Sequence, residues 1–254
     1  MLLHAPLHCS QWTPSNIRMS LDCCNERDSL AEQLQMLGAE TILTSNFEPR
    51  CTHVILNKPQ RNEKFLCALV RGLWLLDTSY VKSSVQSNSL LPEEKYEWGN
   101  PKATHIAATN PSIQTYASAA YRRRVAVQNG NGCNPFSDWR VILALPKDKV
   151  ESMRRILEMG GASIVSCSEL PADLSVVTHV FIDSKKSGLK REEIQSLLAS
   201  EAKCLKAEYI PAYLVNDSSF DETKLKFELP PERASRNESN FSSSRSTRRT
   251  STRS

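Results

Sequence analysis

The chain has 254 residues, of which 40% are hydrophobic and 24% are charged, and its formal net charge is only +4. This length allows two domains of about 100 residues each. A net charge so close to zero argues against a protein that coats nucleic acid, although it leaves room for a local basic site.

Cysteines and apolar segments restrict the class of protein further. The eight cysteines form no CxxC pair with metal-ligand spacing, and Cys23 and Cys24 are neighbours, which does not suit a disulfide framework. There is no secretory signal pattern and no apolar run of about 18 residues or more. We therefore expect a reduced intracellular compartment, nucleus or cytosol, with no membrane association, and an unstructured leader over residues 1–14.

Residues 15–99 show an alternating pattern of strands and helices. Apolar runs of strand length, such as Val54-Ile55-Leu56, alternate with apolar residues at helical spacing, such as Leu30 and Leu34. In chain order the pattern predicts a strand at 17–21, a helix at 27–37, strands at 41–44 and 53–56, a helix at 64–71, a strand at 74–76 and a helix at 78–84. Such alternation is typical of an α/β fold with a mostly parallel sheet and helices on both faces.

Residues 100–134 connect this first module to the next one. A 35-residue connection without structure is unusual in packed domains, so we predict a helix at about 112–128, ended by the sequence NGNG at 129–132. We interpret the three arginines at 122–124 as a solvated helix face, with a nucleic-acid or acidic-partner contact as the alternative.

The pattern of the first module recurs roughly 125 residues later. The pair Gly38-Ala39 is matched by residues 161–162, and Thr52-His53 is matched by residues 178–179. We therefore predict a second module of the same kind at 135–230. Two copies are too few for a solenoid, which needs about three, so we expect a tandem pair of domains. The Ser/Arg-rich tail at 231–254 is expected to be disordered, either as a solvating end or as a nuclear-import or phosphorylation segment.

Lys64 is the residue of the first module that best suits a binding site. It lies at the entrance of the helix predicted at 64–71, after a basic loop. Helix N-termini carry unpaired N–H groups and partial positive charge, so a lysine at this position indicates an anion site.

The order of these motifs resembles the BRCT-domain family, twice over. Gly-Ala after the first helix, Thr-His before the third strand, and Trp74 followed by Tyr80 carry this resemblance. The segments CTHVILNKPQRNEKFLCALVRGLWLL and EEKYEWG resemble, more narrowly, the first domain of the C-terminal BRCT pair in a topoisomerase-II-binding checkpoint scaffold family. The resemblance implies two BRCT domains packed in tandem, each a four-stranded parallel sheet flanked by helices.

Tandem BRCT pairs of that family resemble phosphopeptide readers, and the resemblance implies which residues hold the phosphate. Ser20 matches the hydroxyl position, Leu21 supplies a backbone N–H, Lys64 matches the lysine of the second helix, and Arg27 matches a further arginine. Leu21 departs from the glycine that many readers carry after the hydroxyl residue. Lys206 of the second module is a further candidate for contact with the peptide in the groove between the modules.

The second module lacks the same donors. Counting back from Gly161 places Leu143 at the position of Ser20 and Val150 at the position of Arg27. The counterpart of Lys64 is either Glu193 or Lys190, depending on the direction of counting. Only one phosphate pocket is therefore expected, and it lies in the first module.

The remaining residues with reactive side chains have structural interpretations. We expect Trp74 to lie in the core, with Lys203 at its position in the second module, and His53 and His179 to be structural hydrogen-bonding residues. No nucleophile elbow, metal cluster, phosphate loop or dinucleotide turn is present. We therefore expect no enzyme activity, no metal and no cofactor.

The resemblance implies a phosphoserine- or phosphothreonine-dependent adaptor of the DNA-damage response and replication checkpoint, located in the nucleus. Its partners would be phosphorylated checkpoint or repair proteins. The alternatives are a BRCT module that contacts DNA ends and a scaffold that binds protein independently of phosphate.

Overall fold

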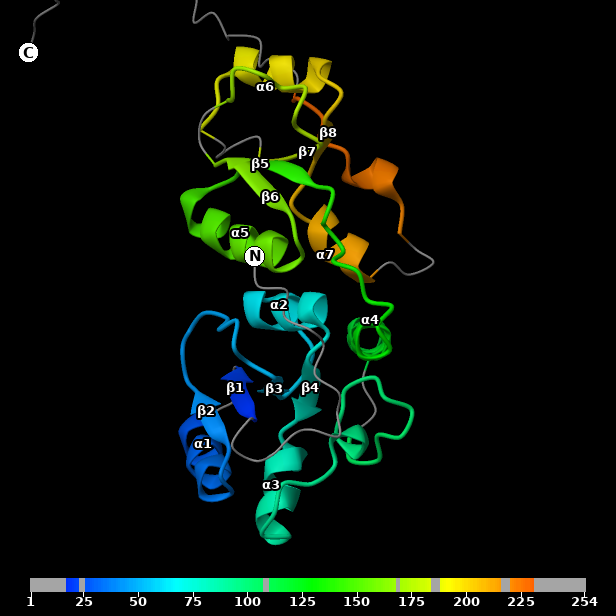
Figure 1. Cartoon of the computed structure of the whole chain (residues 1–254). Coiled ribbons are helices and arrows are strands. Elements are labelled where there is room, and N and C mark those ends of the chain that lie inside the picture. The colour runs from blue at the N-terminus through cyan, green and yellow to red at the C-terminus, as the bar shows by residue number, and fades with distance from the viewer. Residues whose placement is uncertain are drawn as a thin grey trace, which may run out of the picture.

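The computed structural model describes residues 17–22, 26–106, 110–167, 170–183, 188–215 and 220–230. Two parallel sheets, one in each module, lie on either side of a shared layer of helices (Figure 1). The leader and tail predicted at 1–14 and 231–254 lie outside the described residues. Within the described part, no helix is both long enough and apolar enough to span a membrane.

The first module follows the predicted order of elements, and each predicted end agrees within two residues. Its strands are β1 (Arg18–Asp22), β2 (Glu40–Ile42), β3 (His53–Leu56) and β4 (Trp74–Asp77). Its helices are α1 (Arg27–Met36), α2 (Glu63–Arg71), α3 (Ser79–Gln86) and the short 3-10 helix η3 (Glu93–Lys95). The strands pair in parallel in the order β2-β1-β3-β4, which confirms the predicted parallel sheet.

Alternation along β1 assigns its side chains to the two faces of the sheet. Met19 and Leu21 belong to the core that α1 and α3 cover, together with Leu34 and Tyr80. Ser20 therefore points to the opposite face, which α2 covers. This placement brings its hydroxyl to the same side of the sheet as the N-terminus of α2.

The second module repeats this topology, as predicted. Its elements are β5 (Arg140–Ala144), α5 (Lys147–Met159), β6 (Ser163–Ser166), β7 (His179–Ile182), α6 (Arg191–Ala199), β8 (Lys203–Leu205), α7 (Tyr209–Val215) and the 3-10 helix η4 (Glu222–Leu225). The sheet order is β6-β5-β7-β8, again parallel.

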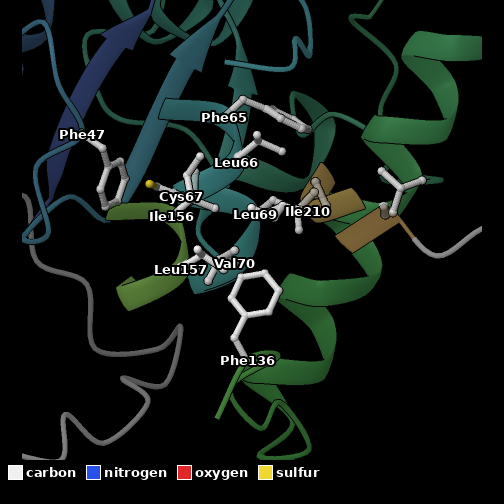
Figure 2. Close-up of a cluster of buried hydrophobic side chains, with 14 of the residues drawn as sticks. Phe47, Phe65, Leu66, Cys67, Leu69, Val70, Phe136, Ile156, Leu157 and Ile210 are labelled. Carbon is white, nitrogen blue, oxygen red and sulfur yellow. The ribbon is translucent and has the colours of Figure 1, made fainter. Parts of the chain in front are cut away.

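Helix α2 is the centre of the contact between the modules. All residues from 64 to 70 are buried, and α2 packs against α5 and α7 of the second module and against the linker helix α4 (Pro111–Gln128). Figure 2 shows the shared cluster, in which apolar side chains of α2 meet side chains of the second module: Phe136, Ile156, Leu157 and Ile210. The implied tandem packing is therefore confirmed, and it runs through α2 of the first module and helices of the second.

The linker helix predicted at 112–128 is present as α4 and begins one residue earlier. Its N-cap Asn110 accepts the N–H of Ile113, and Pro111 occupies the first turn, where a missing N–H does no harm. The backbone of α4 runs directly over Gly99, where a Cβ would lie 2.2 Å from the carbonyl oxygen of Ala117. Gly99 has a φ of +82°, so both its conformation and this close approach require glycine.

The solvated face that we predicted for the three arginines of α4 is correct only for Arg122, which is exposed, whereas Arg123 is half-buried and Arg124 is buried. Arg122 donates to the carbonyl of Val215 at 3.1 Å, at the end of α7. Arg123 donates to the carbonyl of Val70 at 3.0 Å, in the last turn of α2. Carbonyls at helix C-termini lack intrahelical partners and attract cations, so these contacts fasten the linker to both modules.

The third arginine, Arg124, is buried in an ion pair. Its guanidinium donates to both carboxylate oxygens of Glu97, with Nη2 2.8 Å from Oε2, and both side chains are less than a tenth exposed. The guanidinium also lies 3.7 Å from the ring centroid of Trp74. Helical periodicity could not reveal this pairing, because the partners lie in a different part of the chain.

Trp74 is a core residue, as predicted, and only 6% of it is exposed. Its ring stacks near His53, with 6.3 Å between ring centroids. In the second module Lys203 occupies the same position in the strand pairing, opposite His179, so the predicted loss of this tryptophan is confirmed. Trp139 replaces its ring instead, stacking on His179 at 4.0 Å.

Candidate functional site

The candidate site lies at the carboxyl ends of β1 and β3, two neighbouring strands from which the chain continues to opposite faces of the sheet. β1 and β3 are neighbours, and Asp22 is paired with Leu56 at their carboxyl ends. After β1 the chain enters α1 on one face of the sheet, and after β3 it enters α2 on the other face. In open α/β sheets the crevice at such a switch point is where ligands bind.

Ser20 provides an unused hydroxyl at this place. It is fully buried in β1, and its Oγ makes no hydrogen bond of acceptable geometry. The Cys51 thiol lies beside it, and burial raises the pKa of that thiol to about 11, so it stays a weakly polar neutral group. A buried hydroxyl without a strong hydrogen-bond partner costs up to about 1–3 kcal/mol, so Ser20 reduces the stability of the fold.

Lys64 reaches the residue after Ser20 and is also buried, with 5% of the residue exposed. It is the second residue of α2, and its Nζ donates to the carbonyl of Leu21 at 3.2 Å. We predicted that the backbone N–H of Leu21 belongs to the site. The structure shows a contact of Lys64 with the carbonyl of Leu21 instead.

The N-terminus of α2 adds further positive potential. Asn62 caps the helix by accepting the N–H of Phe65 at 2.9 Å. Lys58 and Arg61 are exposed in the loop before the helix, a loop whose basic character the sequence indicated without singling out either residue. The basic loop before α2 and the N-terminus of the helix therefore add positive potential next to Lys64.

Arg27 begins α1, the helix that follows β1. Its side chain is 42% exposed and pairs with Asp28 of the same helix at 3.4 Å. Because α1 starts at the same sheet edge but covers the other face, Arg27 would approach a ligand from the far side of the crevice. The segment between β1 and Glu26, residues 23–25, lies outside the described part of the chain.

Lys206 lies in the second module, apart from these donors. It is exposed, and its Nζ donates to the carbonyl of Lys224 at 3.3 Å. Lys224 lines a pocket of about 510 Å³ between α4, α7 and η4, and Tyr116 forms another part of its wall. Tyr116 packs edge-on against Phe65, the residue after Lys64, with 5.8 Å between ring centroids.

The strand pairing corrects the equivalence drawn for the second module. Met19 pairs with His53, and Val141 pairs with His179, so the counterpart of Ser20 is Ile142 and not Leu143. The count from Gly161 was wrong because the segment between β5 and this glycine is one residue longer than its counterpart. The conclusion is unchanged, because Ile142 also lacks a hydroxyl.

The helix starts correct two further positions. α5 begins at Lys147, three residues before Val150, so the second module keeps a cation where α1 has Arg27. The second residue of α6 is Glu192, so neither Glu193 nor Lys190 occupies the helix position of Lys64. An acidic first turn without a strand hydroxyl disfavours a phosphate, and the complete donor set among the described residues belongs to the first module.

The two histidines have the structural role that was expected. Nδ1 of His53 is 2.7 Å from the hydroxyl of Thr52, and Nδ1 of His179 is 2.8 Å from that of Thr178. Burial lowers the pKa of His179 to about 4, with a smaller contribution from the Lys203 charge. Among the residues that the structure describes, no group of three or more His, Cys, Asp or Glu could hold a metal ion.

Acidification is therefore expected to destabilise the protein through His179. The unfolded imidazole, with an ordinary pKa of 6.5, binds a proton before the folded one, whose pKa is about 4. Stability is retained above pH 6.5 and lost as the pH falls towards 4, by about 3 kcal/mol in total. Urea unfolding across this range should show a steeper pH dependence for the parent than for His179→Phe, and equal slopes would contradict the assignment.

Comparison with known proteins identifies the two modules. A BRCT domain model described as TopBP1/SLF1 matches residues 133–228. The model of the Regulator of Ty1 transposition protein 107 BRCT domain matches residues 9–98. The chain belongs to the BRCT-domain family. The predicted BRCT pair is confirmed, and the family model that bears the name of the topoisomerase-II-binding scaffold matches the second domain.

Relatives and solved structures agree with a BRCT pair. The human "SMC5-SMC6 complex localization factor protein 1" is 30% identical over 183 residues, which are 71% of this chain and 16% of that protein. The chain thus spans about one sixth of the length of this curated relative.

Two solved structures share the fold at low sequence identity. The BRCT5-BRCT6 pair of S. pombe Brc1 is 17% identical, covers 80% of this chain and 96% of its own, and has a TM-score of 0.58. The structure of Rtt107p in complex with a phosphorylated histone is 13% identical, covers 84% of this chain and 92% of its own, and has a TM-score of 0.50.

Proposed function

We propose that this BRCT pair is an adaptor that binds phosphoserine- or phosphothreonine-containing peptides in DNA-damage and replication-checkpoint signalling. Its partners are phosphorylated checkpoint or repair proteins, and it acts in the nucleus without enzyme activity or a cofactor. The observation that carries this proposal is the buried hydroxyl of Ser20, which has at most a weak contact with the Cys51 thiol, together with the Lys64 ammonium, which donates to the carbonyl of the next residue, Leu21. The relationship to a localization factor of the SMC5-SMC6 complex supports a nuclear role.

The chemistry of the donors suits a phosphate monoester. Such a group carries nearly two negative charges at neutral pH and three strong acceptor oxygens. Lys64 has three N–H donors and gives one to Leu21, so turning its ammonium outward offers the remaining donors to the phosphate. Ser20 then donates its hydroxyl, and Arg27 closes the site from the α1 side.

In this proposal the second domain shapes the groove and does not hold the phosphate. The pocket between α4, α7 and η4 is lined by two aromatic residues, Tyr116 and Phe220. Tyr116 also contacts Phe65, the residue after Lys64. Lys206 borders this region through its bonds to η4. Peptide residues beyond the phosphate can therefore contact both domains, which stay fixed by a shared core.

A matched binding screen tests the proposal. The full chain is titrated into a library of fluorescent peptides with a central phosphoserine or phosphothreonine and degenerate flanks, and into the same library without phosphate. We expect binding only to the phosphorylated peptides. Equal binding to both libraries would instead indicate a phosphate-independent scaffold.

Direct binding to DNA ends is the alternative, and the exposed Lys58 and Arg61 are the feature that favours it. Binding to duplex DNA weakens steeply with salt, because each neutralised phosphate releases counterions. Titrating a 5′-phosphorylated duplex over a range of salt concentrations separates the two functions. Tight binding of this duplex by the parent, without selectivity for phosphopeptides, would favour the DNA function.

Ser20→Ala separates function from stability in this site. We expect its phosphopeptide affinity to fall by roughly tenfold or more, because one hydrogen bond to a charged group contributes about 1.5–3 kcal/mol. The melting temperature should stay equal or rise, because the substitution removes a buried hydroxyl that has at most a weak contact with the Cys51 thiol. Fluorescence anisotropy and thermal melting measure the two quantities, and a loss of stability without a loss of affinity would contradict the assignment.

A further inference from the structure

The phosphate-binding lysine has an acidic neighbour. Glu63 is the first residue of α2 and directly precedes Lys64. Its Oε1 accepts the N–H of Phe47 at 2.9 Å, and only 14% of its side chain is exposed. The carboxylate is thus fixed at a helix N-terminus, where the helix dipole stabilises it, but where it also repels an incoming phosphate.

An arginine of the second domain neutralises this carboxylate. Arg155 lies on α5, and its Nε and Nη2 donate to the two oxygens of Glu63 at 2.9 and 3.0 Å. Such a two-point arginine–carboxylate pair is stronger and more strictly oriented than a single contact. The pair is also partly shielded from solvent, since 30% of the Arg155 side chain is exposed.

We propose that Arg155 is a positioning residue of the phosphate site in the other domain. It cancels the charge of Glu63 and holds the first turn of α2, so that Lys64 faces the ligand without a competing negative neighbour. This inference rests on the proposed phosphopeptide function. It gives the second domain a direct part in phosphate affinity, beyond completing the groove.

The double substitution of Arg155 and Glu63 distinguishes charge cancellation from a role of Arg155 in the domain interface alone. If Arg155 only fastened the domains, removing Glu63 as well could not restore binding. If Arg155 acts by cancelling the Glu63 charge, then neutralising Glu63 removes the need for it. Glu63→Gln suits this purpose, because the amide keeps an oxygen that can accept the N–H of Phe47.

Arg154 provides a matched control on the same helix. It is the preceding residue, and it pairs with Glu151 at 2.6 Å and with Glu158 at 3.7 Å, both on α5 itself. Arg154→Ala therefore removes the same charge from the same helix without touching Glu63. Its phosphopeptide affinity should remain that of the parent.

The experiment uses five versions of the 254-residue chain: the parent, Arg155→Ala, Glu63→Gln, the double variant and Arg154→Ala. The probe is one phosphothreonine peptide selected from the degenerate library, with its unphosphorylated form as reference. We expect Arg155→Ala to lose roughly tenfold in affinity for the phosphorylated form. The double variant should recover to within about threefold of the parent, since no charge is then left uncompensated beside Lys64.

The possible outcomes separate this inference from the proposed function. If the parent does not prefer the phosphorylated peptide, the proposed function fails and the inference fails with it. If the parent prefers it but Arg155→Ala binds equally well, only the inference fails. A double variant as weak as Arg155→Ala would also overturn it, because Arg155 would then act on the peptide or on the interface itself. Circular dichroism and thermal melting confirm that each variant is folded.

Discussion

Lys64→Glu is expected to abolish measurable phosphopeptide binding. The substitution removes the ammonium beside Ser20 and places a carboxylate where the phosphate must approach. Each hydrogen bond from a charged donor contributes about 1.5–3 kcal/mol, and about 1.4 kcal/mol corresponds to tenfold in affinity. Loss of more than one such bond, together with charge repulsion, should move binding beyond the range of anisotropy titration.

A second variant guards against loss of the fold, because Lys64 is buried and donates to Leu21. Lys64→Gln keeps an N–H donor but removes the charge, so it should fold normally and still bind at least tenfold more weakly. Lys149→Glu makes the same change of charge as Lys64→Glu at an exposed position of α5 and should bind like the parent. Parent-like affinity in a folded Lys64→Gln protein would refute the role of the lysine.

The local features of this fold were predictable because short patterns determine them. The apolar run of β3 and the helical spacing of α2 gave element ends within one residue of those observed. The repeated Thr-His pairs marked the third strand of each domain, since their hydroxyl and imidazole form a local bond. The choice of Ser20 and Lys64 rested on the family pattern, and in the structure Lys64 donates to the carbonyl of Leu21, the residue after Ser20.

Equivalences between the two domains were less reliable, because counting assumes that helices and loops keep their lengths. α5 spans 13 residues and α1 spans 10, so positions counted from the glycine after the helix do not match positions in the strand. For this reason the count places Leu143 at the position of Ser20, whereas the strand pairing places Ile142 there. Strand pairing fixes the register directly, and only the structure shows it.

Contacts between distant segments could not be predicted from one sequence. Arg124 and Glu97 are 27 residues apart, and Arg155 and Glu63 are 92 apart. No periodicity links such pairs, and exposed charge is the ordinary expectation for arginine. They become visible only once α4 and α5 are placed against the first domain.

The shared core also determines how function should be tested. Leu69 and Val70 of α2 pack with Phe136 and Ile156 from the second half of the chain. Separating the domains exposes these side chains, and each large apolar side chain that loses its burial costs about 1.5–3 kcal/mol. Binding experiments therefore need the complete pair, and effects of second-domain variants on phosphate affinity are physically reasonable.

Trp74→Ala is expected to destabilise the first domain by about 3–5 kcal/mol, because it removes a large buried aromatic side chain and leaves a cavity. The substitution also removes a contact of the buried Arg124–Glu97 ion pair. The Trp74 ring supports the Arg124 guanidinium, whose buried pair with Glu97 connects the linker helix to the sheet. Opening this region to water weakens a pair that depends on exclusion of solvent.

Urea unfolding followed by circular dichroism measures this effect. Because total stability is of the order of 5–15 kcal/mol, the alanine variant should unfold at a much lower urea concentration than the parent. Trp74→Phe is the matched control, since it keeps an aromatic face beneath Arg124 and should lose clearly less stability. If Trp74→Ala unfolds at the same urea concentration as the parent, Trp74 cannot be a core residue of β4, and the ring cannot be the support of the buried ion pair.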